Sequence, residues 1–183
     1  MNVIVLTGGT SKRFGSDKSQ AKIGELTLLE ILASNLIEHD LIIVGPKSSI
    51  NAKYVREEPI HSGPLAAIGA GLKYVQSYMV GIFATDMPFA PRLINQLVGA
   101  MVRDAVLPVD ADGEAQPLAG VFKTESLRRA LMQYETLVDQ SVKSLISKLE
   151  IDFVSNLDTE LLLDIDTEAD LMRASKLQSR LAQ

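Results

Sequence analysis

The sequence predicts a three-layer α/β protein with a mainly parallel, doubly wound, Rossmann-like sheet. Short apolar segments alternate, nearly throughout, with segments whose apolar residues recur at helical spacing. This alternation is typical of β-α-β units, in which helices cover both faces of a parallel sheet. The 183 residues are 46% hydrophobic and 22% charged, which suits one globular domain over residues 1–183.

Each predicted strand is a short run of valine, isoleucine, leucine and other apolar residues. Residues 3–6 (VIVL) end just before two glycines, and residues 41–44 (LIIV) end at Gly45 and Pro46, where the backbone is expected to turn. Continuous apolar runs of this kind suit strands that are buried on both faces. The predicted strands are residues 3–6, 41–44, 80–84, 105–108, 118–122 and 151–154.

The predicted helices carry apolar residues three and four positions apart. Pro64 suits the first turn of one helix, and Pro88 is expected to begin another. Thr167 and Asp170 have capping-box spacing at the start of the last helix, although the box prefers Glu or Gln at its fourth position. The predicted helices cover residues 26–37, 64–75, 93–101, 124–134 and 141–149, and a final one follows Thr167.

Composition excludes several classes of function. A net charge of −5 argues against a nucleic-acid-binding protein with a broad basic face. The absence of cysteine excludes disulfides, thiolate metal sites and a cysteine nucleophile. We expect neither a signal peptide nor a spanning helix, because the first apolar run is short and no apolar stretch approaches about 20 residues. We therefore expect a cytoplasmic protein with no membrane partner.

The first predicted strand leads into a loop that opens on two adjacent glycines and carries three cations. Gly8 and Gly9 allow backbone N–H groups to curl closely around an anion. Lys12, Arg13 and Lys18 add the charge that a triphosphate requires. The spacing fits neither a P-loop nor a dinucleotide fingerprint. On spacing alone, two interpretations stay open: a phosphate cradle, and a glycine turn with solvated cations.

Asp86 follows the predicted strand of residues 80–84 and precedes Met87 and Pro88. A carboxylate at the carboxyl end of this strand would face the same crevice as the glycine loop. Carboxylates combined with phosphate oxygens are the usual ligands of Mg²⁺ in nucleotide sites. The alternative is a helix cap, which is a frequent role of aspartate before proline.

Six segments, spread along nearly the whole chain, form recognisable motifs. They are LTGGTSKRFGSDKS (6–19), SGPLAAI (62–68), ATDMPF (84–89), QPLAGVF (116–122), SVKSLISKL (141–149) and DIDTEADL (164–171). Together they resemble the molybdenum cofactor guanylyltransferase family of nucleotidyltransferases. The resemblance implies a fold of the nucleotide-diphospho-sugar transferase type. It also implies Mg²⁺-dependent transfer of GMP from GTP to molybdopterin with release of pyrophosphate, and transient contacts with proteins of the cofactor pathway.

The resemblance also implies roles for individual residues. It assigns Arg13, Lys18 and Asp86 to catalysis, and Asp86 and Asp166 to Mg²⁺. Nucleotide binding falls to Leu6, Gly8, Gly9, Thr10, Ser11, Arg13, Lys18, Glu58, Gly63, Pro64 and Asp86.

Four residues depart from the family pattern. Glu58 stands where the family has aspartate, and Ala67 where it has glycine. Asp164 and Asp166 replace two asparagines; either is a candidate second ligand, and Asp164 equally suits a helix cap.

Alternatives remain open at the level of sequence. A cytidylyltransferase, or another nucleotidyltransferase with a different phosphorylated acceptor, would share the loop. A non-catalytic nucleotide-binding regulator would share it as well. Gln116 is placed to reach an acceptor but also suits a plain strand start, and Lys143 suits either an anionic acceptor or a solvated helix face.

Overall fold

The structure is a computed structural model that describes residues 1–7 and 21–181, and within these ranges seven strands form one sheet. In spatial order the strands are β5 (Lys53–Val55), β4 (Asp40–Val44), β1 (Asn2–Leu6), β6 (Met79–Ala84), β8 (Ala119–Lys123), β7 (Ala105–Pro108) and β9 (Ile151–Val154). All neighbouring strands run parallel except at β8, which is antiparallel to both β6 and β7. The predicted mainly parallel, doubly wound sheet is confirmed.

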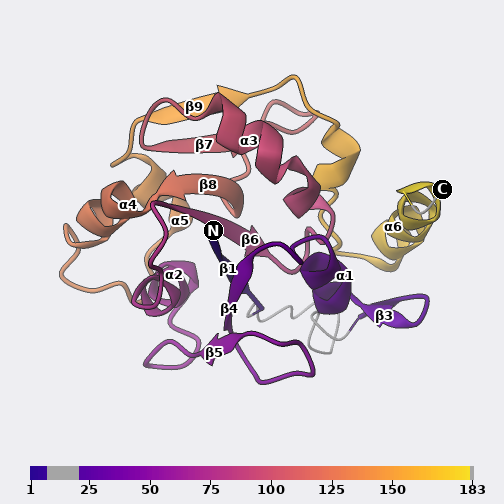
Figure 1. The fold of residues 1–183 in the computed structure, drawn as a ribbon, viewed down its shortest axis with the longest axis horizontal. Coiled ribbons are helices and arrows are strands. Elements are labelled where there is room, and N and C mark those ends of the chain that lie inside the picture. Colours follow the sequence, from indigo (N-terminus) through magenta and orange to yellow (C-terminus); the bar gives the residue numbers. More distant parts are fainter. Residues whose placement is uncertain (8–20, 182–183) are drawn as a thin grey trace.

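Both faces of the sheet are covered, as the continuous apolar strands require. In β1, Val3 and Val5 face one core and Ile4 and Leu6 face the other, because side chains alternate along a strand. The first core is covered by α1 (Leu28–Ser34), the 3₁₀ turn η2 (Ala90–Leu93), α3 (Ile94–Ala100) and α6 (Glu168–Leu181). The second is covered by α2 (Pro64–Leu72), α4 (Thr124–Leu131) and α5 (Val142–Ile146) (Figure 1). The three layers agree with the prediction.

Several boundaries differ from the expected ones. The helix expected from residue 26 begins at Leu28, because Thr27 caps it: the Thr27 hydroxyl accepts from Glu30 N, and the Glu30 carboxylate accepts from Thr27 N. Pro88 does not begin the helix after β6; the helical turn starts at Ala90, with Pro91 in its first turn. The short β2 (Lys22–Ile23), β3 (Leu26–Thr27) and η3 (Thr159–Leu162) were not predicted.

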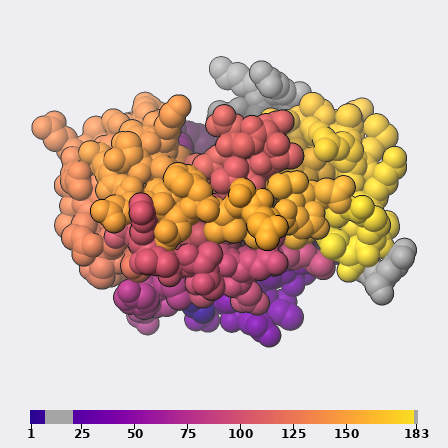
Figure 2. Space-filling view, turned by 90° about the horizontal axis from the view of Figure 1, so that it is seen from above, coloured from indigo at the N-terminus to yellow at the C-terminus, as the bar shows by residue number. Residues whose placement is uncertain are grey.

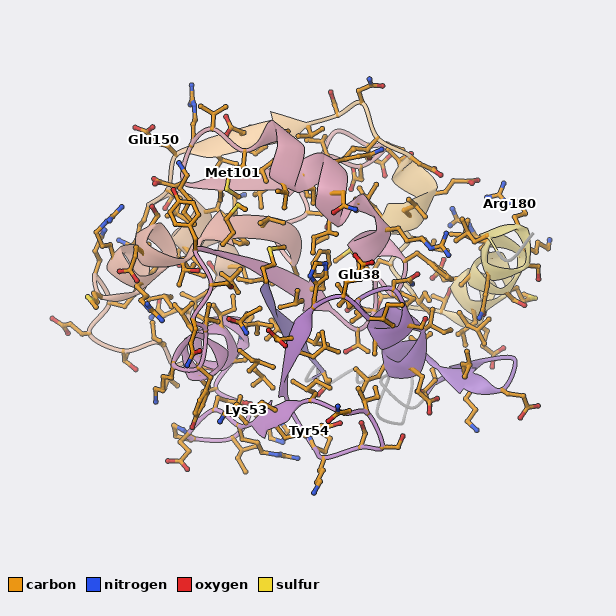
Figure 3. The ribbon with its side chains drawn as sticks, in the orientation of Figure 1. Glu38, Lys53, Tyr54, Met101, Glu150 and Arg180 are labelled. Atoms are coloured by element: carbon orange, nitrogen blue, oxygen red, sulfur yellow. The ribbon has the colours of Figure 1, made fainter. Side chains whose placement is uncertain are left out.

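The two edges of the sheet lie at opposite sides of the molecule. In Figure 3, Lys53 and Tyr54 mark β5 at one edge, and Glu150 marks the chain just before β9 at the other. Figure 2 shows the face that carries the β9 edge, with the residues that follow it running across toward α6. In the part of the chain that the structure describes, no helix has both the length and the apolar character needed to cross a bilayer.

Candidate active site

The parallel strands β4, β1 and β6 end at the same edge of the sheet, and two buried threonines link their ends. Thr7 donates to Val44 O from its backbone N (3.2 Å) and from Oγ1 (3.1 Å). Thr85 donates in the same way to Leu6 O, at 3.1 Å from N and 2.7 Å from Oγ1. These bonds fix the points where the chain leaves each strand. Sequence reasoning missed both threonines, although a polar residue directly after an apolar run was a visible signal.

Gly45, at the end of β4, is a further residue that sequence reasoning noted only as a strand stop. Its φ is +156°, and a Cβ atom built on it would lie 1.7 Å from Thr7 Oγ1. Since that separation is far below van der Waals contact, no side chain fits between β4 and Thr7. The glycine therefore allows the ends of β1 and β4 to approach each other.

The predicted phosphate loop begins at this edge. Leu6 is buried, and its carbonyl oxygen already accepts the two bonds from Thr85, so it anchors the start of the loop. The other predicted residues of the loop lie outside the described residues: Gly8, Gly9, Thr10, Ser11, Lys12, Arg13 and Lys18.

Asp86 lies two residues beyond β6, at the middle of the same edge. The backbone N of Ile165 donates to Asp86 O at 3.0 Å, which brings the segment 164–166 against Asp86. Asp86 does not cap the next helix, because η2 starts only at Ala90 and has no side-chain cap. Two segments that are far apart in the sequence, both carrying predicted metal ligands, thus meet at one point.

The start of α6 settles the alternative role of Asp164. The cap of this helix is formed by Thr167, whose Oγ1 accepts from Asp170 N at 3.2 Å, while the Asp170 carboxylate accepts from Thr167 N at 3.0 Å. The predicted capping box is confirmed, and Asp164 is not its cap. The hydrogen bond from the Thr167 side chain is the main reason why the pKa of Asp170 is lowered.

The carboxylates at this edge suit a hard divalent cation. Asp86 Oδ1 is shielded from solvent, Asp166 is half-buried and Asp164 is exposed. Within residues 1–7 and 21–181, no group of three or more His, Cys, Asp or Glu side chains could hold a metal ion by itself. Mg²⁺ is commonly held by only one or two carboxylates, together with substrate phosphates and water. The oxygen donors of Asp86 and of segment 164–166 fit that arrangement.

Glu58 and Gly63 lie in the connection from β5 to α2, and Pro64 begins α2. Gly63 adopts φ +87° directly before Pro64, the first residue of α2, and this helix has no side-chain cap. The first N–H groups of α2 are thus left for an anion, and the helix dipole favours one there. The neighbouring Ser62 is buried, and its carbonyl oxygen accepts from Asp139 N at 2.8 Å, which anchors the connection.

Glu58 is exposed and lines a pocket of about 520 Å³ formed by β5, α2 and residues 136–138. β5 and β6 are three positions apart in the sheet, so Glu58 and Asp86 follow strands separated by about 14 Å. The structure therefore brings Asp86 and Asp166 together but places Glu58 well to one side of them.

On the other side of Asp86, residues 108–116 form a hairpin beyond the end of β7. Val109 and Ala115 form an antiparallel bridge, and Gln116 N donates to Pro108 O at 2.9 Å. The Asp110 carboxylate lies inside the turn, and the hydrogen bond from Glu114 N is the largest cause of its lowered pKa. The polar loop predicted for 109–116 is thus ordered around one carboxylate. Lys143 lies in α5, within the layer that covers the second core.

Two solved structures share this fold over nearly their whole length. A molybdopterin-guanine dinucleotide biosynthesis protein A from Archaeoglobus fulgidus has a similar structure, with a TM-score of 0.76 and 23% identity over 98% of this chain and 100% of that one. The 2-C-methyl-D-erythritol 4-phosphate cytidylyltransferase from Thermus thermophilus is also similar, with a TM-score of 0.71 and 16% identity over 97% and 98% of the two chains.

The sequence identifies the family. Residues 3–153 match the family model described as the MobA-like NTP transferase domain, and the chain belongs to this family. A probable molybdenum cofactor guanylyltransferase from Mycolicibacterium paratuberculosis is 32% identical, over 92% of this chain and 91% of that protein. A protein of the same name from Carboxydothermus hydrogenoformans is 26% identical over 98% of this chain and 97% of its own length. The resemblance read from the motifs is confirmed, and the protein is a nucleotidyltransferase.

Proposed function

We propose that this protein transfers GMP from GTP to molybdopterin and releases pyrophosphate, with Mg²⁺ as the divalent ion. The observation that carries the proposal is the meeting of Asp86 with segment 164–166 at the carboxyl edge, next to the strand that enters the predicted phosphate loop. The names of the relatives and the family membership support the same reaction. The proposed domain is residues 1–183, and the proposed location is the cytoplasm.

In this proposal, the chain acts mainly by positioning and by neutralising charge. Asp86 and Asp166 hold Mg²⁺, which would withdraw charge from the α-phosphate that the acceptor attacks. Arg13 and Lys18 bind the triphosphate, and Leu6 anchors the loop that contains them. No covalent intermediate with the protein is needed, because the terminal phosphate of the acceptor is itself the nucleophile.

The nucleotide occupies the side of Asp86 that is formed by β1, β4 and β5. Gly8, Gly9, Thr10 and Ser11 offer backbone and hydroxyl donors to the phosphates. The start of α2 has no side-chain cap and adds backbone N–H groups nearby, which begin after Pro64 because proline has no N–H of its own. Glu58 then contacts the nucleoside end, which lies farthest from Asp86.

Identification of the product tests the proposal. The purified protein is incubated with Mg²⁺, molybdopterin and either GTP or CTP, and the pterin product is analysed by mass spectrometry. We expect the guanine dinucleotide from GTP and little product from CTP. A cytosine dinucleotide would keep the chemistry and overturn the choice of base, and no product with either nucleotide would overturn the choice of acceptor.

A further inference from the structure

The 108–116 hairpin lies across Asp86 from the side proposed for the nucleotide. The sheet order places β1, β4 and β5 on one side of β6, and β8, β7 and β9 on the other. Since Asp86 follows β6, a nucleotide bound over the first group of strands leaves the second group to face the attacking substrate. β7, from which the hairpin projects, is two strands and about 10 Å from β6.

The hairpin is joined to the strand that carries Asp86. Ala84 N, two residues before Asp86, donates to Leu118 O at 2.9 Å. Leu118 lies two residues after Gln116, inside a turn closed by the bond from Ala119 N to Gln116 O at 3.1 Å. Gln116 therefore sits at the point where the hairpin returns to the sheet beside β6.

The side chain of Asp110 binds three donors within the hairpin. Oδ1 accepts from Asp112 N and Glu114 N, both at 2.9 Å, and Oδ2 accepts from Gln116 Nε2 at 2.6 Å. An ionised carboxylate only accepts, so the Gln116 amide must turn its NH₂ group to Asp110. Its carbonyl oxygen is then directed elsewhere, and a ligand that meets this oxygen must donate an N–H or O–H.

We propose that Asp110 is a positioning residue for the acceptor substrate: it fixes the orientation of the Gln116 amide, so that the Gln116 carbonyl oxygen selects an acceptor that donates a hydrogen bond. The identity of the acceptor as molybdopterin rests on the proposed function, whereas the hydrogen bond from Gln116 to Asp110 does not. An asparagine at position 110 keeps the size of the side chain but can present an NH₂ group to Gln116. The glutamine amide would then turn over and offer a donor where the acceptor needs an oxygen.

Asp110→Asn and Asp112→Asn form a matched pair for the test. Each substitution removes one negative charge from the same turn. Asp112 contacts Asp110 through its backbone N, so its side chain does not orient the Gln116 amide. The KM values for molybdopterin and GTP are measured separately with Mg²⁺. We expect Asp110→Asn to raise the KM for molybdopterin by about fivefold to tenfold and to leave the KM for GTP unchanged, while Asp112→Asn changes neither. The Gln116 side-chain amide resonances, followed by NMR, should shift in Asp110→Asn only.

Equal KM values for molybdopterin in the two variants would overturn the inference, and so would an equal rise in the KM for GTP, which would indicate general damage to the site. If the wild-type protein transfers no GMP, the proposed reaction fails, and binding of molybdopterin is measured by ultrafiltration instead. Weaker binding in Asp110→Asn than in Asp112→Asn would then uphold the inference. Equal binding in the two variants, or no binding by the wild type, would overturn it.

Discussion

The two sides of the sheet's carboxyl edge are held in place by different chemistry. Around β4, β1 and β6, the backbone is fixed by the hydroxyls of Thr7 and Thr85 and by the missing side chain of Gly45. Beyond β7, the hairpin is fixed by the charged carboxylate of Asp110. The first side is part of the sheet and contains no titrating group in these contacts, whereas the second stands outside the sheet and depends on one ionised residue.

This difference fits the proposed roles of the two sides, which are binding of the nucleotide phosphates and binding of the acceptor. Phosphates are alike in every nucleoside triphosphate, so a rigid edge built from backbone and small side chains suits them. A hairpin that stands outside the sheet can change its turn without disturbing the strands, which suits the binding of the more specific substrate, the acceptor. In the proposed site, both substrates meet at Asp86, which follows β6 between the two sides.

The largest effect is expected at Asp86. Asp86→Asn keeps the shape of the side chain but removes the charge that would hold the divalent ion. We expect the rate of GMP transfer to fall at least about 100-fold, which corresponds to about 2.7 kcal/mol in activation free energy. The thermal unfolding temperature, measured in parallel, should stay close to that of the wild type. A variant that retains most of its kcat would remove Asp86 from the reaction.

The second effect concerns the stability of the nucleotide side. Gly45→Ala forces a Cβ atom into Thr7 Oγ1, and we expect the free energy of unfolding to fall by about 1–3 kcal/mol. Gly99→Ala, in α3, is the matched control, because a Cβ atom built on Gly99 has nothing within 4 Å; this variant should be more stable by about 0.5–1 kcal/mol. Urea unfolding of both variants measures the difference. If the two variants changed stability alike, the close approach of β1 and β4 would be unimportant.

A smaller effect is expected at the start of α6, next to Asp166. Thr167→Ala removes the hydroxyl that caps the helix and should lower the free energy of unfolding by about 1 kcal/mol. Thr167→Ser keeps the hydroxyl and should lie close to the wild type in the same unfolding experiment. Equal losses in the two variants would show that the methyl group, and not the cap, stabilises this end.

The smallest effect is a difference between the two sides in how they respond to acid. Hydrogen bonds lower the pKa of Asp110 in the folded protein, so its contribution to stability is present above the unfolded pKa of about 3.9. That contribution is lost as the pH falls through the lower pKa of the folded state. In an acid titration followed by NMR, the amides of 110–116 should shift with a carboxylate midpoint, while the amides of Thr7 and Gly45 stay constant until global unfolding. Simultaneous changes on both sides would remove the distinction between them.

The sequence was sufficient for the strands and helices whose apolar pattern is strong. Residues 3–6 and 80–84 are continuous apolar runs, and the structure buries them on both faces as expected. β5 escaped prediction because Lys53, Tyr54 and Val55 form too short a run and are held as a strand by their pairing with β4. The prediction that Pro88 begins the next helix was wrong because proline suits several positions near a helix start. In the structure, Pro91 is the proline in the first turn.

Sequence reasoning could propose site residues only where a strand end or a motif marked them. Asp86 was a candidate from its place after an apolar strand and from the resemblance, and Asp166 from the resemblance alone; no pattern in the sequence revealed that Ile165 N would bond to Asp86 O. The roles of Thr7 and Gly45 depend on a contact between two strands, which a linear sequence does not show. Asp110 carried a local signal, because aspartate before a glycine turn often accepts from nearby N–H groups.

The most direct test of the central claim is the release of pyrophosphate from GTP by the wild-type protein, with and without molybdopterin and with and without Mg²⁺. If Asp86 lies between a nucleotide side and an acceptor side, release should require GTP, the pterin and the metal ion together. Release of pyrophosphate at the same rate with and without the pterin would contradict the two-sided site. Binding of GTP without any release would contradict transfer and would favour a nucleotide-binding regulator.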